Sequence, residues 1–241
     1  MTDIENTATT HAVLVPGFWL GGWAWDEVVS ALQRAGIVAH AVTLPGLDPD
    51  DPVDGEVTLD DHVAAVAGLV DGLDGDVVLV GHSGGGAVVQ GVLDRHPGGI
   101  RRAVYVDTGP LLDGTLLWDA DGTGDVPLPS WDELEAEGTS LEGLDDEIRE
   151  RFRTRAVDHP GGVARSAMRV TDERRLAVPA TVICTSVPSA VLIEAIHAGQ
   201  VPSELGQLAE VRYVDLPTGH WPMFSRPADL AGVLAAEITR S

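Results

Sequence analysis

Short apolar runs alternate with amphipathic segments along most of the chain, and this alternation predicts its secondary structure. Apolar runs rich in valine and other β-branched residues predict buried strands at 11–17, 37–46, 76–83, 100–109, 179–186 and 211–219. Apolar residues at helical spacing predict helices at 25–36, 59–73, 84–95, 188–199 and 226–240. Strands that alternate with helices are typical of an α/β fold. We therefore expect a mostly parallel sheet of about six strands with helices on both faces.

Residues 110–177 interrupt this alternation. They contain no strand-like run and are rich in Asp, Glu and Gly, although SWDELEAEG and LDDEIRERFRTRAV have helical character. Such a segment is too long for a plain loop, so we expect a helical cap inserted between core segments 1–109 and 178–241. A solvated acidic appendage is the alternative. Large apolar side chains favour the cap, because an appendage has little use for them: Leu116, Leu117, Trp118 and Trp131.

Length, composition and charge exclude several classes of protein. The chain has 241 residues, of which 44% are hydrophobic, and this is enough for one large folded domain. Its formal charge of -23 argues against nucleic-acid binding, and the absence of lysine excludes a Schiff-base mechanism. No apolar run approaches the roughly 18 residues of a membrane span, and MTDIENTATT is no signal sequence. We expect a cytoplasmic protein whose single Cys184 is a buried core thiol.

The stretch VVLVGHSGGG places Ser83 between Gly81 and Gly85, where a predicted strand ends and a predicted helix begins. A structural turn needs perhaps one glycine, whereas four of the six residues from Gly81 to Gly86 are glycine. G-x-S-x-G in this context is typical of a nucleophile elbow, in which glycines allow a close approach of strand and helix. We expect the Ser83 hydroxyl to project above the carboxyl ends of the strands, where α/β sheets bind ligands.

A nucleophilic serine requires a base and an oxyanion hole. His220 follows the last predicted strand, so we expect it to be the base, and we expect His82 to be structural. The remaining histidines form no metal-type cluster, and no metal site is expected. We expect the oxyanion hole to consist of the backbone N–H groups of Gly84 and of Phe18. Phe18 lies in the loop VPGFWLGGWAW after the first predicted strand.

Together these motifs resemble the α/β-hydrolase superfamily. The segments GFWLGGWAWDEV, GHSGGG and GHWPMFSRPADLA are similar to its small esterase, methylesterase and hydroxynitrile lyase branch. The similar hydroxynitrile lyases carry Thr where Gly17 stands and Lys where Trp221 stands, and these departures favour ester hydrolysis. The residues that we expect to bind substrate are Gly17, Trp19, Trp118, Trp131 and Trp221.

The third expected member of the triad is the acid that orients the histidine. In most of the family it follows the strand predicted here at 179–186, but the loop TSVPSAVL contains no carboxylate. A subset of the family supplies the acid one strand earlier, where VYVDTGP offers Asp107. A turn-forming Asp is the alternative for this residue. Asp215 lies inside a predicted strand and Glu194 inside a predicted helix, so Asp107 is the better candidate.

These expectations describe a serine hydrolase without cofactor or metal that cleaves an ester or lactone of an apolar small molecule. Ser83, His220 and Asp107 are its expected triad, and it is expected to be a monomer or homodimer that binds neither nucleic acid nor membrane. Two alternatives stay open. The same scaffold could carry a cofactor-free dioxygenase, lyase or perhydrolase, or it could be a ligand receptor without catalytic activity.

Overall fold

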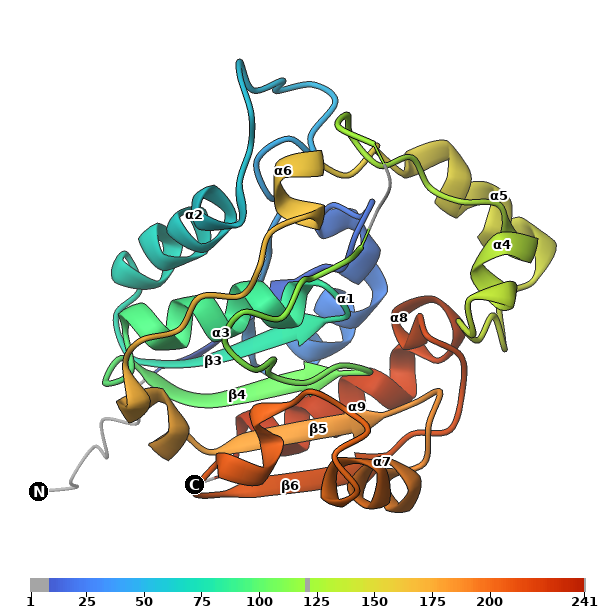
Figure 1. Ribbon diagram of the computed structural model, residues 1–241. Coiled ribbons are helices and arrows are strands. Elements are labelled where there is room, and N and C mark those ends of the chain that lie inside the picture. The colour runs from blue at the N-terminus through green and yellow to red at the C-terminus, as the bar shows by residue number, and fades with distance from the viewer. Residues whose placement is uncertain (1–8, 120–121, 241) are drawn as a thin grey trace, which may run out of the picture.

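A computed structural model describes residues 9–119 and 122–240, which form a six-stranded sheet with helices on both faces (Figure 1). The strand order is β2-β1-β3-β4-β5-β6, and all neighbouring strands are parallel. The strands are β1 (Thr10–Val15), β2 (Val38–Ala41), β3 (Asp76–His82), β4 (Ile100–Val106), β5 (Ala180–Cys184) and β6 (Val211–Asp215). This architecture confirms the predicted fold class.

The α-helices are α1 (Asp26–Arg34), α2 (Leu59–Asp71), α3 (Gly85–Arg95), α4 (Trp131–Ala136), α5 (Asp146–Arg155), α6 (Gly161–Ala164), α7 (Ser189–His197), α8 (Pro222–Ser225) and α9 (Pro227–Ile238). Three 3-10 helices are also present, namely η1 (Gly22–Trp25), η2 (Glu173–Ala177) and η3 (Glu204–Gln207). Within the described residues, no helix is long and apolar enough to cross a bilayer.

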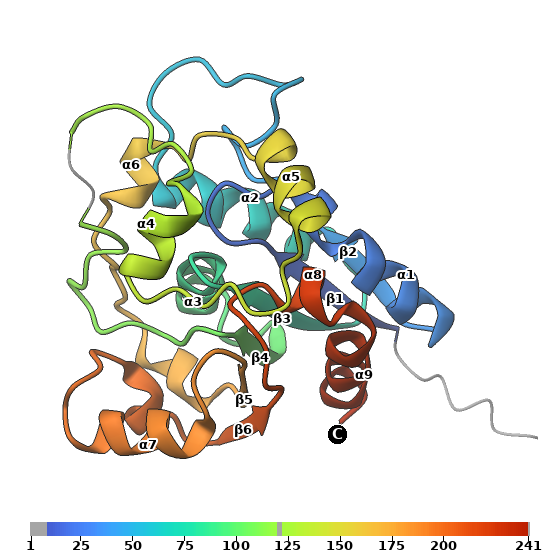
Figure 2. The ribbon, with the colours of Figure 1, turned by 90° about the vertical axis from the view of Figure 1, so that its right-hand side faces the viewer.

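The sheet separates two layers of helices, as Figure 2 shows, with α2 and α3 on one side and α1 and α9 on the other. Successive side chains of a strand point to opposite faces, so each strand contributes to both layers. In β1, Val13 and Val15 pack in the cluster that contains the buried residues of α2 and α3. Ala12 and Leu14 pack in the cluster that contains those of α1 and α9. Burial on both faces explains why the strands are nearly continuous apolar runs.

All six strands end earlier than the sequence pattern predicts, and the difference is largest for β2, β4 and β6. β2 ends at Ala41, where its pairing with β1 stops, and the chain then turns through Pro45 and the left-handed Gly46. β4 ends at Val106 because Asp107 has a φ of 49°, which no regular strand continues. β6 ends at Asp215. In each case the residues beyond the strand belong to loops at the carboxyl edge of the sheet.

Residues 110–177, here called the cap segment, connect β4 to β5 and contain α4, α5, α6 and η2. Figure 1 shows α4 and α5 together beyond the carboxyl ends of the strands. The cap segment is packed against the core through Phe152 of α5, which is fully buried among the rings of Trp23, Trp221 and Phe224. Its position places cap side chains above the end of β3, where Ser83 lies.

Candidate active site

Ser83 occupies a sharp turn between β3 and α3. Its φ of 50° lies in the left-handed region, which a serine adopts only where the surrounding structure imposes it. The contacts that hold Ser83 in this conformation are made by the glycines on either side of it. A Cβ at Gly81 would lie 2.7 Å from the carbonyl oxygen of Gly85, and a Cβ at Gly85 would lie 2.5 Å from that of Pro16. Only glycine fits at either position, so the sequence G-x-S-x-G is explained by close backbone packing.

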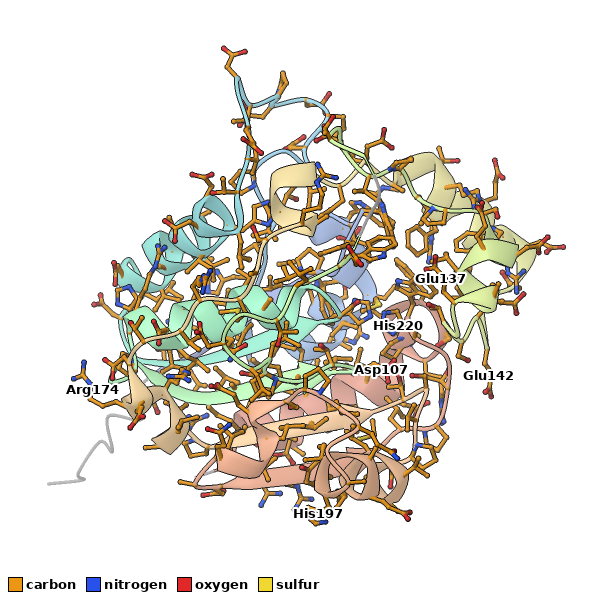
Figure 3. The ribbon with its side chains drawn as sticks, viewed as in Figure 1. Asp107, Glu137, Glu142, Arg174, His197 and His220 are labelled. Atoms are coloured by element: carbon orange, nitrogen blue, oxygen red, sulfur yellow. The ribbon has the colours of Figure 1, made fainter. Side chains whose placement is uncertain are left out.

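The structure brings the three predicted triad side chains into one hydrogen-bonded chain. His220 Nε2 lies 2.9 Å from Ser83 Oγ, and His220 Nδ1 lies 2.7 Å from Asp107 Oδ2. An ionised carboxylate can only accept, so Nδ1 carries the proton and Nε2 is free to accept that of the serine hydroxyl. His220 and Asp107 are labelled in Figure 3.

Asp107 is held by the loop that follows β5. Its Oδ1 accepts hydrogen bonds from the backbone N–H groups of Thr185, at 3.1 Å, and Ser186, at 2.9 Å. Its Oδ2 accepts a hydrogen bond from the Ser186 hydroxyl at 2.6 Å. Burial by itself raises the pKa of this carboxyl, but the hydrogen bonds from His220 and Ser186 outweigh it and leave the pKa below its usual range. Asp107 therefore stays ionised at neutral pH.

His82 precedes the serine and hydrogen-bonds to the backbone of His220. His82 Nε2 donates a hydrogen bond to the carbonyl oxygen of His220 at 2.7 Å. Complete burial, together with the nearby charge of His220, lowers the pKa of His82 far below its usual value. His82 is thus a neutral residue that positions the loop carrying the base, in agreement with a structural role.

A cavity of about 190 Å³ opens next to the Ser83 hydroxyl, between the core and the cap segment. Its lining is Phe18, Trp19, His82, Ser83, Gly84, Leu117, Trp118, Leu134, Glu137, Thr139, His220 and Trp221. Trp19, Trp118 and Trp221 were predicted to bind substrate. Leu134, Glu137 and Thr139 were not predicted, because nothing in the sequence of the cap segment shows which residues of α4 and the turn after it line the cavity.

Gly17 and Trp131, which the sequence also predicts to bind substrate, are not among the residues that line this cavity. Gly17 packs behind the elbow, where a Cβ would lie 2.9 Å from both Ser83 Cβ and His82 Nδ1. The Trp131 ring is directed to a neighbouring aromatic cluster, with its centroid 5.4 Å from that of Phe152. On its other side lies the guanidinium of Arg153, 4.5 Å from the ring centroid. Trp131 therefore supports the cap from outside the cavity.

The two predicted oxyanion donors, Phe18 and Gly84, both line the cavity beside Ser83. Among the described residues, neither backbone N–H group donates a hydrogen bond within the protein. Both groups are therefore available to an oxygen atom bound in the cavity, as an oxyanion hole requires.

The loop that carries Phe18 is held by the cap segment through Trp19, which has a strained φ of 64°. The Trp19 indole donates to the Val126 carbonyl at 3.0 Å, and the Trp19 carbonyl accepts from Val157 N–H at 3.1 Å. The Trp19 N–H donates to His159 Nδ1 at 3.4 Å, and the His159 ring stacks on Phe18 with centroids 3.8 Å apart. Burial lowers the pKa of His159, so its ring stays a neutral acceptor.

The sequence contains no signal for the contact of Trp19 with His159, because the two residues are 140 positions apart and belong to no motif. In the sequence, His159 is only one of several histidines without metal-ligand spacing. In the described part of the chain, no group of three or more His, Cys, Asp or Glu side chains is placed to hold a metal ion.

Comparison with known proteins shows similarity to α/β hydrolases. Residues 12–233 match the model of the alpha/beta hydrolase family. The carbendazim hydrolyzing esterase of Nocardioides sp. (strain SG-4G) is 44% identical over 98 residues, which are 39% of this chain and 40% of that protein. Putative methylesterase 12, chloroplastic, of Arabidopsis thaliana is 30% identical over 119 residues, 48% of this chain and 34% of that protein. These matches thus span less than half of either relative's length.

Solved structures show the same fold over almost the whole chain. An extracellular alpha/beta-hydrolase from a Paenibacillus species superposes with a TM-score of 0.75 at 19% identity, over 94% of this chain and 98% of that one. A pyrethroid hydrolase from Sphingobium faniae JZ-2 superposes with a TM-score of 0.67 at 23% identity, over 95% and 97% of the two chains.

Proposed function

Because the chain belongs to the alpha/beta hydrolase family, we propose that it hydrolyses an ester or lactone of an apolar small molecule. The observation that carries this proposal is the hydrogen-bonded chain from Ser83 through His220 to Asp107, which ends in an aromatic cavity. The relatives named as esterase and methylesterase support the same reaction class. We propose a cytoplasmic location, with no requirement for a cofactor or metal.

In the proposed mechanism, Ser83 Oγ attacks the ester carbonyl while His220 Nε2 takes its proton. Negative charge develops on the carbonyl oxygen, and the N–H groups of Phe18 and Gly84 stabilise it. His220 then gives the proton to the leaving alcohol, and an acyl-enzyme forms on Ser83. Water activated by His220 releases the acid in the second half of the reaction. Asp107 stays ionised and stabilises the imidazolium at both steps.

The crowding around Gly17 weighs against a hydroxynitrile lyase on this scaffold. A threonine at this position would place its Cβ 2.9 Å from Ser83 Cβ, closer than such atoms approach one another. Trp221 also stands where a lysine would be needed, and the chain contains no lysine. The residues of the site do not distinguish a cofactor-free dioxygenase, a perhydrolase or a receptor from a hydrolase. These alternatives are separated by activity measurements.

The proposed function is tested with p-nitrophenyl acetate, p-nitrophenyl butyrate and a panel of lactones, followed by labelling with a fluorophosphonate. We expect turnover of at least one ester or lactone and a single adduct on Ser83 by intact-mass analysis and peptide mapping. Ester turnover without an adduct would refute the covalent mechanism. Adduct formation or ligand binding without any turnover would favour the receptor, and oxygen uptake with a heteroaromatic compound would indicate the dioxygenase.

Substitution of Trp118 tests the role of the cavity wall. Trp118 lines the cavity and contacts Phe18 and Trp19, with ring centroids 5.8 and 5.3 Å away. We expect Trp118→Ala to raise KM for bulky esters about tenfold and KM for acetates much less, because the lost contacts are those of a large acyl or alcohol group. Trp131→Ala is the matched control, since Trp131 is a tryptophan of the same cap segment that is not among the residues lining the cavity. Equal effects of the two variants on bulky esters would contradict this assignment.

A further inference from the structure

Glu137 is an exposed acidic residue of the cavity beside Ser83. It follows α4 directly and is the one acidic residue among the residues that line the cavity in the described structure. Four aromatic residues share that lining, namely Phe18, Trp19, Trp118 and Trp221. The chain has many exposed carboxylates, so exposure alone means little. What distinguishes Glu137 is that it belongs to the lining of the cavity next to the nucleophile.

The charge of Glu137 is not neutralised by the protein. Among the described residues its carboxylate has no hydrogen-bond or ion-pair partner, whereas nearby Glu133 is engaged by Ser130 at the start of α4. No arginine belongs to the cavity lining in the described structure. The arginines of neighbouring α5 are directed elsewhere, for example Arg153 onto the Trp131 ring and Arg155 onto the Trp23 ring.

A cavity lined by an unpaired acidic residue and several aromatic residues favours the binding of a ligand with a positively charged group. The carboxylate attracts a cation directly, and the faces of Trp and Phe rings attract it through their quadrupoles. The same carboxylate repels an anionic substrate, because no arginine of the described lining offsets it. We propose that Glu137 is a specificity-determining residue that selects esters carrying a positively charged nitrogen in the part facing the cap segment. This inference rests on the proposed esterase function.

The experiment compares two thioesters of equal shape that differ in charge. Acetylthiocholine carries a trimethylammonium group, and S-(3,3-dimethylbutyl) thioacetate carries a neutral tert-butyl group in its place. We expect the ratio of kcat/KM for the cationic over the neutral substrate to fall about fivefold in Glu137→Gln, because an exposed charge contributes modestly. Glu137→Lys should lower the ratio further. Neither change should alter turnover of the neutral substrate by a similar factor.

Glu142→Gln is the matched control. Glu142 is an exposed acid of the same cap segment that does not line the cavity, and Figure 3 labels both residues. The control should keep the wild-type ratio. An equal fall in Glu137→Gln and Glu142→Gln would assign the effect to the net charge of -23 and overturn the proposal. An unchanged ratio in Glu137→Gln would also overturn it, while hydrolysis of the neutral thioester would leave the esterase function standing. If neither the two thioesters nor the p-nitrophenyl esters are hydrolysed, both the role of Glu137 and the esterase function are refuted.

Discussion

Replacing Ser83 by alanine is expected to lower kcat at least about 10³-fold on any ester that the protein hydrolyses. The substitution removes the proposed nucleophile, the Ser83 Oγ that lies 2.9 Å from His220 Nε2. The variant keeps the Cβ, so the contacts that hold the left-handed turn are unchanged. The residual rate should reflect the oxyanion donors and substrate binding alone.

Two measurements accompany this variant. Thermal unfolding should match the wild type, because Ser83 Oγ makes no contact that the core requires, and fluorophosphonate labelling should disappear. Ser189→Ala is a suitable control. Ser189 is the first residue of α7, and its hydroxyl donates a hydrogen bond to Asp215. Persistence of wild-type kcat in Ser83→Ala would show that another group performs the chemistry.

Replacing Asp107 by asparagine is expected to reduce kcat by up to about 10⁴-fold, by analogy with Asp-to-Asn substitution in a serine protease triad. The N–H groups of Thr185 and Ser186 point at Oδ1, so the amide oxygen of asparagine must occupy that position. The amide NH₂ group then faces His220 and donates to Nδ1. The imidazole is forced to carry its proton on Nε2, where it can no longer accept the proton of Ser83.

The fold should survive this change, because asparagine tolerates the left-handed conformation that Asp107 adopts. Asp215→Asn and Glu194→Gln are the controls and should remain near wild type. Asp215 accepts hydrogen bonds from Ser189 and lies at the end of β6, which is separated from β4 by β5. Near-normal kcat in Asp107→Asn combined with a crippled Asp215→Asn would reassign the acid.

Sequence reasoning succeeds where the determinants are local. The valine runs predict the strands because both faces of the sheet are covered, and the glycines around Ser83 predict the elbow because no larger residue fits. The choice of Asp107 depends on the loop after β5 having no carboxylate. The structure shows what this loop contributes. Thr185 and Ser186 donate the hydrogen bonds that hold the Asp107 carboxylate, so the loop positions a carboxylate that follows β4.

The sequence is less informative about the cavity, because the cavity depends on how the cap segment docks. Trp118 and Trp131 are both large aromatic residues of the cap, but of the two only Trp118 lines the cavity beside Ser83. The difference arises from the packing of α4 and α5 against Trp221 and Phe224, contacts between residues far apart in the chain. The partnership of Trp19 with His159 escapes prediction for the same reason.

The hydrogen bonds of Trp19 also make the proposed oxyanion hole a product of two distant parts of the chain. Val126, Val157 and His159 of the cap segment hydrogen-bond to Trp19, the neighbour of the proposed donor Phe18. The other proposed donor, Gly84, belongs to the elbow in the core. A change in the cap that breaks these bonds should therefore lower kcat through Phe18 even where the hydrogen bond between Ser83 and His220 is intact.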